Sequence, residues 1–99
     1  MRKQIVNSEN RKFLYEAILK LNSLEECEAF FEDLCTVQEL ESISQRLVVA
    51  KLLTEGRVYT DIVERTGAST ATISRVNRTL NYVGNGGYKT VFDRLKDDE

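Results

Sequence analysis

The stretch GASTATISRVNR, residues 67–78, decides the fold class, because it has the pattern of a tight turn followed by a short amphipathic helix. Gly67 can adopt the positive φ that such a turn needs, and Ser69 belongs to the residue types that cap helix N-termini. Ile73, Val76 and the later Leu80 recur at spacings of three and four. This spacing predicts a helix over residues 69–81 with one buried stripe.

A second short helical pattern precedes the turn, over residues 59–66, where Ile62 and Val63 can face inward. Two short helices joined by a turn that contains glycine describe a helix-turn-helix. The same pattern fits a plain helix hairpin with a polar outer face. The residues opposite the buried stripe help to distinguish the helix-turn-helix from the plain helix hairpin.

Projection of the second helix at about 100° per residue places small and basic residues opposite its buried stripe. Small side chains would let this face enter the major groove of DNA, which is about 12 Å wide. Hydroxyls and free helix N–H groups can bind phosphate oxygens, and arginines can reach guanine edges or phosphates. No acid lies on this face. The candidate DNA-binding residues are Thr70, Ala71, Thr72, Ser74, Arg75 and Arg78, with Gly67 in the turn and Ser69 as the cap.

The rest of the chain predicts four more helices and no strand, so we expect an all-α domain of six helices spanning residues 1–99. The first helix can start at Asn7 or Ser8, and Ser23 and Thr36 open capping boxes with Glu26 and Glu39. The third helix ends at Gly56, and residues 84–87 form a loop. The final helix covers residues 88–96. The expected inward residues of the third and final helices are Leu40, Ile43, Leu47, Ala50, Leu52 or Leu53, Val91, Phe92 and Leu95.

The net charge of −2 hides an uneven distribution. Residues 25–41 hold seven acids and no base, whereas residues 65–92 hold four bases and no acid. A chain divided in this way can present one basic face to DNA while another face repels it. Solvated helix faces would give the same pattern.

Several functions are disfavoured by composition. The chain has no histidine, and its two cysteines, Cys27 and Cys35, do not complete a zinc site, so we expect neither catalysis nor a metal or other cofactor. The segment GNGGYKT (residues 84–90) departs from a phosphate-binding loop, because Tyr88 separates its glycines from the lysine. No apolar run approaches the roughly 18 residues of a membrane span. Without a signal peptide, a cytoplasmic location is expected.

The segment from residue 34 to residue 82, LCTVQELESISQRLVVAKLLTEGRVYTDIVERTGASTATISRVNRTLNY, resembles the bacterial Trp repressor-like superfamily, and in particular its YerC/YecD-type branch. The resemblance covers about residues 12–95. It implies a transcriptional regulator that acts as an intertwined homodimer on double-stranded DNA. Residues 8–55 and 88–96 would form the dimerisation body, and residues 59–81 the DNA-binding head. The apolar first two helices agree with a dimer. The alternative is a helical protein-interaction module that keeps the fold without reading DNA.

The resemblance breaks at the ligand site. Trp repressor holds tryptophan with an arginine followed by a glycine, whereas Arg75 here is followed by Val76. Gln45 and Arg46 stand near the place of the family's second ligand-binding arginine. We therefore expect that tryptophan is not a corepressor, and leave open whether another small molecule binds.

Overall fold

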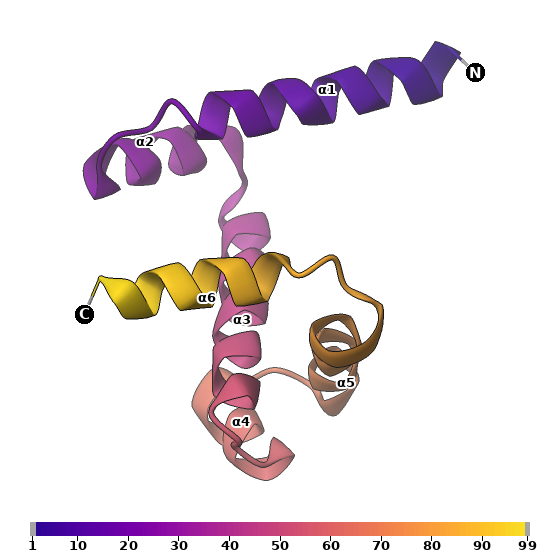
Figure 1. Ribbon diagram of the computed structural model, residues 1–99, viewed down its shortest axis with the longest axis vertical. Coiled ribbons are helices and arrows are strands. Elements are labelled where there is room, and N and C mark those ends of the chain that lie inside the picture. Colours follow the sequence, from indigo (N-terminus) through magenta and orange to yellow (C-terminus); the bar gives the residue numbers. More distant parts are fainter. Residues whose placement is uncertain (1, 99) are drawn as a thin grey trace. The chain divides into compact units, whose positions relative to one another are not determined.

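The computed structural model describes residues 2–98 of the chain, and side chains from residue 7 onward. All regular structure in this part is helical, which confirms the predicted all-α class with six α-helices (Figure 1). None of these helices is both long and apolar enough to cross a bilayer. The helices are α1 (Arg2–Ile18), α2 (Leu24–Leu34), α3 (Val37–Thr54), α4 (Tyr59–Thr66), α5 (Thr70–Arg78) and α6 (Gly87–Asp97), and a π-helical turn, η1 (Thr79–Val83), follows α5.

The chain divides into two compact units, with the boundary inside α3 between Leu40 and Glu41. The first unit contains α1, α2 and the first turn of α3. The second contains the rest of α3 and all later elements. The two units differ in how much they bury. Every buried side chain of the described residues belongs to the second unit, and none of residues 7–40 is buried.

The first unit is organised by its helix caps. Ser23 accepts a hydrogen bond from the Glu26 N–H at 3.1 Å, while Glu26 Oε1 accepts from the N–H of Asn22 at 2.8 Å. At the start of α3 the exchange is reciprocal: Thr36 Oγ1 accepts from Glu39 N–H at 3.1 Å, and Glu39 Oε1 accepts from Thr36 N–H at 2.8 Å. Both predicted cap residues are therefore confirmed. These caps fix where α2 and α3 begin.

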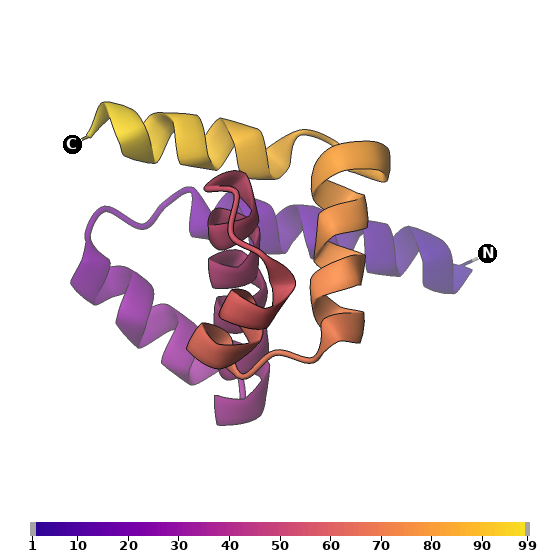
Figure 2. The same cartoon turned by 90° about the horizontal axis from the view of Figure 1, so that it is seen from below.

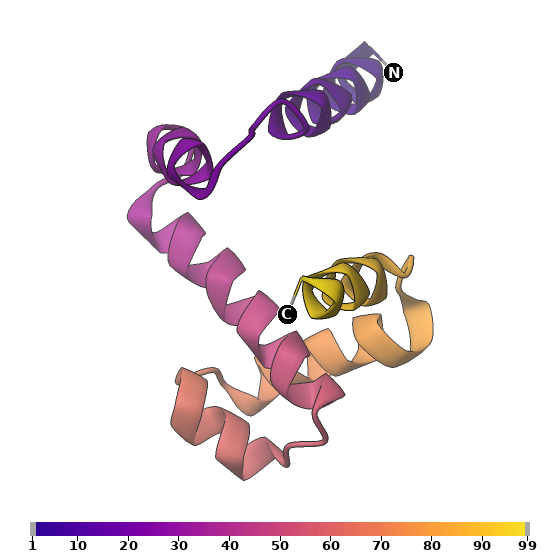
Figure 3. The ribbon, with the colours of Figure 1, turned by 60° about the vertical axis from the view of Figure 1, so that its left-hand side comes forward.

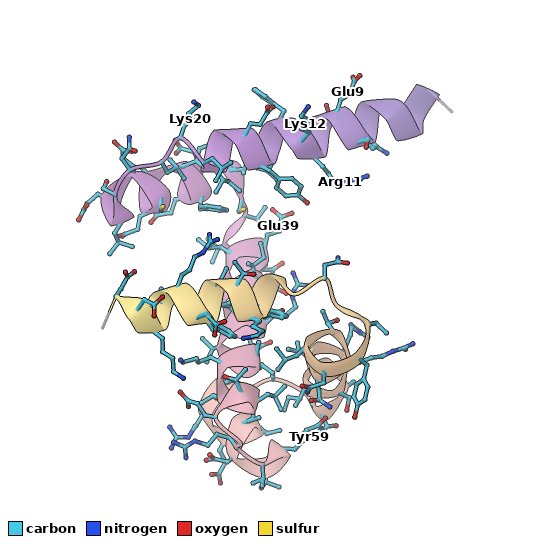
Figure 4. The ribbon with its side chains drawn as sticks, in the orientation of Figure 1. Glu9, Arg11, Lys12, Lys20, Glu39 and Tyr59 are labelled. Carbon is cyan, nitrogen blue, oxygen red and sulfur yellow. The ribbon has the colours of Figure 1, made fainter. Side chains whose placement is uncertain are left out.

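The predicted start of α1 at Asn7 or Ser8 is wrong, because α1 begins at Arg2. No glycine or proline lies in this segment, and the residues before Asn7 include good helix formers, so the helix continues through the supposed cap. Charged side chains leave α1 on more than one side, with Glu9 and Lys12 opposite Arg11 in Figure 4. Phe13 remains 74% exposed. On the same helix Leu14, Ala17 and Ile18 are half-buried, so the apolar residues of α1 are only partly covered.

The second unit is built around one small core. α6 lies across α3 (Figures 1 and 3), and Phe92 brings its ring into the cluster while the Lys51 ammonium lies 5.6 Å from the ring centroid. Tyr88 stacks on Phe92 at 5.9 Å between ring centroids. The buried residues are Val49, Ala50, Ile62, Ala68, Ile73, Val76 and Phe92. Because all these elements contribute to it, this core fixes α4 and α5 against the C-terminal part of α3.

The inward face of α3 differs in part from the predicted one. Ala50 is buried as predicted, and Leu40, Leu52 and Leu53 are half-buried. The predictions for Ile43 and Leu47 are wrong, since these side chains are 44% and 42% exposed. In their place the β-branched Val49 is fully buried. The buried residues of α3 lie in its C-terminal half, while Ile43 and Leu47 lie on its exposed side and at the edge of a hollow.

The same correction applies to α6. Phe92 is buried as predicted, whereas Val91 and Leu95 are 46% and 51% exposed. About half of each of these two side chains is therefore open to solvent. With Leu47 and Leu80, Val91 lines an apolar hollow of about 510 Å³ beside the loop of residues 84–87. An apolar face of the second unit therefore stays open to solvent.

Candidate nucleic-acid interface

The turn between α4 and α5 has the conformation that the sequence predicted for it. Gly67 adopts φ 72°, the left-handed region that costs other residues energy, and its N–H donates to the Val63 carbonyl. Ala68, which follows it, is buried, and its N–H donates to Thr66 Oγ1 at 3.1 Å. The turn is therefore anchored in the core. Figure 2 shows α5 running from this short connection in a different direction from α4.

Ser69 caps α5 as predicted. Its side-chain oxygen accepts the Thr72 N–H at 3.1 Å, and its hydroxyl donates to Thr72 Oγ1 at the same distance. The cap places an exposed Thr70 and an exposed Ala71 at the front of the helix. Thr72 is half-buried and its hydroxyl is held by Ser69. The first turn of α5 therefore carries short side chains, and its helix N–H groups are available to an anion.

The inward stripe of α5 is confirmed. Ile73 is fully buried, Val76 is 4% exposed, and Leu80, which lies in η1, is half-buried. The predicted helix over 69–81 is correct up to Arg78, after which the backbone widens into the π-helical turn that ends at Val83. A projection at 100° per residue does not hold beyond Arg78, because η1 is π-helical. The assigned face therefore ends with Arg78.

Ala71, Ser74, Arg75 and Arg78 are all exposed, and the structure places them on the side of α5 away from Ile73 and Val76. Within the described residues, neither Arg75 nor Arg78 forms an ion pair or a side-chain hydrogen bond. Both guanidinium groups can therefore meet an external acceptor without first losing an internal one.

The other two bases of residues 65–92 are compensated by acids just outside that segment. Arg65 Nε lies 3.2 Å from Asp61 Oδ1, and Arg57 contacts the same carboxylate at 3.3 Å. Lys89 Nζ lies 2.8 Å from Asp93 Oδ2, a hydrogen bond that raises the pKa of Lys89 above its ordinary value. The count of four uncompensated bases in the sequence thus becomes two in the structure, both of them on α5.

A polar hollow of about 360 Å³ lies beside this helix, between α3 and α5. Arg75 contributes to its wall and so links the outward face to the hollow. Gln45 Nε2 donates to the Thr66 carbonyl at 3.1 Å, which fixes the Gln45 side chain. The lining residues are Ser42, Gln45, Arg46, Thr72, Arg75, Val76, Thr79 and Tyr88. The resemblance predicted that Gln45 and Arg46 lie near a ligand site. Nothing in the sequence indicates that Ser42, Thr79 and Tyr88 lie close to them.

The acidic segment 25–41 has no basic partner within its own unit among the described residues. Two of its acids have a structural role, since Glu26 and Glu39 satisfy N–H groups at helix starts. Figure 4 labels Glu39 at the beginning of α3. Cys27 and Cys35 are half-buried free thiols. In the described part of the chain no cluster of three or more potential metal ligands occurs.

Comparison with known proteins relates the whole of this arrangement to one family. A family model described as Trp repressor protein matches residues 9–96. The YerC protein of Bacillus subtilis (strain 168) is 56% identical over 86 residues, covering 87% of this chain and 82% of that protein. This identity supports the resemblance to the YerC/YecD-type branch.

Two solved structures are similar in both sequence and fold. A TrpR-like protein from Eubacterium eligens ATCC 27750 is 59% identical with a TM-score of 0.85, covering 89% of this chain and 90% of that one. A proposed Trp repressor from Staphylococcus aureus is 47% identical with a TM-score of 0.86, covering 97% of this chain and 95% of that one.

Proposed function

The chain belongs to the Trp repressor family, and on this basis we propose that it is a transcriptional regulator that binds double-stranded DNA as a homodimer in the cytoplasm. The observation that carries the proposal is the outward face of α5, where two arginines without internal partners follow a front of small residues. A surface of this kind has the dimensions and the charge that the major groove requires. The proposal assigns no enzymatic activity to the chain.

Each residue of the proposed interface has a distinct task. Arg75 and Arg78 contact guanine edges or phosphates, and Ala71 leaves room for the helix to approach the bases. Thr70, Thr72 and Ser74 supply hydroxyls and backbone N–H groups to the DNA backbone. Gly67 and Ser69 act indirectly, because they set the direction and the starting point of the helix that carries the others.

The proposed homodimer accounts for the apolar surface of the chain. Leu24, Leu34 and Phe13 are 70%, 52% and 74% exposed, and Val91 and Leu95 are exposed on α6. A monomer rarely leaves so much apolar surface in water. We propose that residues 1–99 act as one domain, with residues 8–55 and 88–96 as the dimerisation body and residues 59–81 as the head. A twofold dimer of this kind would present two α5 helices to half-sites about one DNA turn apart.

Tryptophan is not expected to act as a corepressor. Val76 follows Arg75 where the family's ligand site has a glycine, and its branched side chain is almost completely buried. The Gln45 amide, which stands near the place of a ligand-binding arginine, is already hydrogen-bonded to Thr66. Calorimetry is the direct test: low-micromolar binding of L-tryptophan would contradict the expectation.

Selection of bound fragments from a random DNA library tests the proposed function. The expected result is a palindromic consensus whose half-site centres are about 34–36 Å apart. Affinity for that site should fall as salt rises, because phosphate contacts release counterions. If no fragment is enriched and no DNA binds even at low salt, the result favours the alternative, a helical protein-interaction module.

The assignment of the contact face has its own test. Arg75→Ala and Arg78→Ala should each cost about 1–3 kcal/mol of binding free energy where the arginine reads a guanine, and should relax specificity at that base pair. Arg94→Ala removes the same charge from α6 and serves as the matched control. Unchanged affinity of the Arg75→Ala/Arg78→Ala double variant at low salt would show that another face contacts DNA.

A further inference from the structure

We propose that Asn85 is a site of spontaneous chemical modification, at which its side-chain amide becomes a carboxylate through a cyclic imide with the backbone. Asparagine is one of the chemically labile residues of proteins, and it reacts most readily where glycine follows it. Asn85 and Gly86 form the only Asn-Gly pair of the sequence. They lie in the segment GNGGYKT, which has no part in the proposed DNA interface, so the proposal holds whether or not the chain binds DNA.

The reaction joins two neighbouring groups and consumes only water. The backbone nitrogen of Gly86 loses its proton and attacks Cγ of Asn85, which closes a cyclic imide. The Cγ–Nδ2 bond breaks, and the amide nitrogen takes up a proton and leaves as ammonia. Water then opens the imide at either carbonyl. One opening gives aspartate with the ordinary backbone, and the other gives isoaspartate, whose backbone runs through the former side chain.

The structure leaves both reacting groups free. Asn85 is exposed in the connection between η1 and α6 (Figure 1). Within the residues that the structure describes, neither the Asn85 side chain nor the Gly86 N–H forms a hydrogen bond. Attack of this nitrogen on Cγ therefore breaks no existing hydrogen bond, and solvent can reach the imide to open it.

Gly86 removes the steric barrier to the attack. A side chain on the residue after asparagine hinders the approach of its backbone nitrogen, and Gly86 has no Cβ. Its φ is 82°, and its carbonyl accepts from the N–H and the hydroxyl of Thr90 at 3.1 and 3.0 Å. These bonds hold the far side of Gly86 at the start of α6. The peptide group that reacts, between Asn85 and Gly86, remains free to rotate.

The other asparagines lack this combination. A helix holds the backbone N–H of the next residue in a hydrogen bond, and four asparagines lie in helical segments: Asn7, Asn10, Asn77 and Asn81. Asn81 Nδ2 also donates to Asn77 Oδ1 at 2.6 Å. Asn22 is exposed and lies outside the helices, but Ser23 follows it and places a side chain beside the attacking nitrogen. Asn22 is therefore the matched control for Asn85.

The two products should differ in their effect on α6. Position 85 lies just before the N-cap Gly86, and a carboxylate close to a helix N-terminus is favoured by the helix dipole. Isoaspartate instead lengthens the backbone between the half-buried Leu80 and the buried Phe92, two positions fixed by packing. We expect the fold to tolerate aspartate and to lose stability with isoaspartate.

Incubation of the full chain in alkaline and in mildly acidic buffer, followed by trypsin digestion and mass spectrometry, tests the proposal. The tryptic peptide of residues 79–89 holds both Asn81 and Asn85, and fragment ions assign the amide-to-acid mass change to one of them. The change should appear first at Asn85. It should be faster in alkaline buffer, because the attack needs the Gly86 nitrogen without its proton. Asn22, in the peptide of residues 21–46, should keep its amide over the same period.

A synthetic peptide of residues 79–89 gives the rate in the absence of the fold. Asn85 of the folded chain should react within about tenfold of this rate, since few ordered residues must change conformation. Asn85→Gln should remove the modification from this loop, because closure of the larger ring is slow. Stronger protection by the fold, or earlier modification at Asn22 or Asn81, would overturn the proposal.

The effect on stability is measured on the separated products. Each product makes the net charge of −2 more negative by one unit, so anion exchange separates it from the parent protein. Methyl transfer by an isoaspartyl-specific methyltransferase identifies the isoaspartyl fraction. This fraction should unfold at lower urea than the Asn85→Asp variant, which carries the same charge on an ordinary backbone. Equal urea midpoints would overturn the expected cost of the longer backbone.

Discussion

Ser69 acts from just outside the helix that it stabilises. Its side chain accepts the Thr72 N–H, a group that has no partner within the helix. We expect Ser69→Ala to lower the free energy of unfolding by about 1 kcal/mol, measured by urea denaturation. Ser74→Ala, at an exposed position in the same helix, is the matched control and should change stability little. Equal losses from both variants would mean that the cap has no special contribution.

At the residue scale the sequence was most informative at positions where the backbone conformation or a helix end favours only a few residue types. Gly67 and Ser69 were predicted because positive φ and helix capping each favour few residues, and both are confirmed. Val49 and Ala68 were missed. A valine beside several leucines gives no signal of its own, and burial of a turn alanine depends on which helices pack around it. Whether Thr70, Ala71, Ser74, Arg75 and Arg78 bind DNA stays a prediction, because residue type and exposure do not identify a partner.

At the scale of elements, the clearest sequence signals were the capping boxes, because they are local. The start of α3 at Thr36 and Glu39 and the range of α4 were predicted correctly. The inward faces of α3 and α6 were predicted less well, since the sequence does not say where along a long amphipathic helix its neighbours lie. The π-helical turn after Arg78 could not be foreseen from a 3.6-residue period.

The capping box of α3 should respond to acid. The hydrogen bond from the Thr36 N–H and that from its hydroxyl hold the pKa of Glu39 below its ordinary value. A depressed pKa means that the stabilisation is present above the unfolded-state pKa and is lost as pH falls through the folded-state value. A carboxyl NMR titration should therefore give Glu39 a midpoint below that of glutamate in a model peptide, and Thr36→Val should raise it. A midpoint that Thr36→Val leaves unchanged would contradict this assignment.

The end of η1 depends on Gly84 for a steric reason. A Cβ at this position would overlap the Thr79 carbonyl oxygen and lie 3.3 Å from Thr79 Cγ2. Gly84→Ala should therefore destabilise the fold by about 1–3 kcal/mol, the usual cost of overpacking. Gly87→Ala is the matched control, because a Cβ there meets nothing within 4 Å and φ is not positive. That substitution should stabilise slightly, so urea midpoints that move in the same direction would argue against the steric account.

At the scale of the whole molecule, the open apolar faces predict dimerisation. Leu34 on α2 is 52% exposed. Leu34→Glu should raise the dimer dissociation constant about a hundredfold, because two copies each lose a buried leucine worth at least about 1.5 kcal/mol. Glu32→Gln, on the polar side of the same helix, should change it little. Sedimentation equilibrium measures both, and a parent protein that stays monomeric at high micromolar concentration would contradict the proposed assembly.

The sequence indicated the family and the helix count, but the dimer body stays a prediction for a physical reason. Phe13, Leu24 and Leu34 are apolar in either state, and a sequence does not distinguish a face that is buried within the chain from one buried by a second copy. The structure shows that these three side chains are exposed in a single copy of the chain, which the sequence alone does not reveal.

The location of the core has a consequence for the time course of folding. Among the residues that the structure describes, the buried ones lie between Val49 and Phe92, within one unit of the chain, so they meet through intramolecular contacts alone. We expect this part to fold first, in a phase whose rate is independent of protein concentration. Residues 7–40 contain no fully buried side chain, and in the proposed dimer they would gain most of their stability when two copies collide, in a later bimolecular phase. In a growing cell, the concentration of new copies would then set how soon each of them reaches the proposed dimeric state.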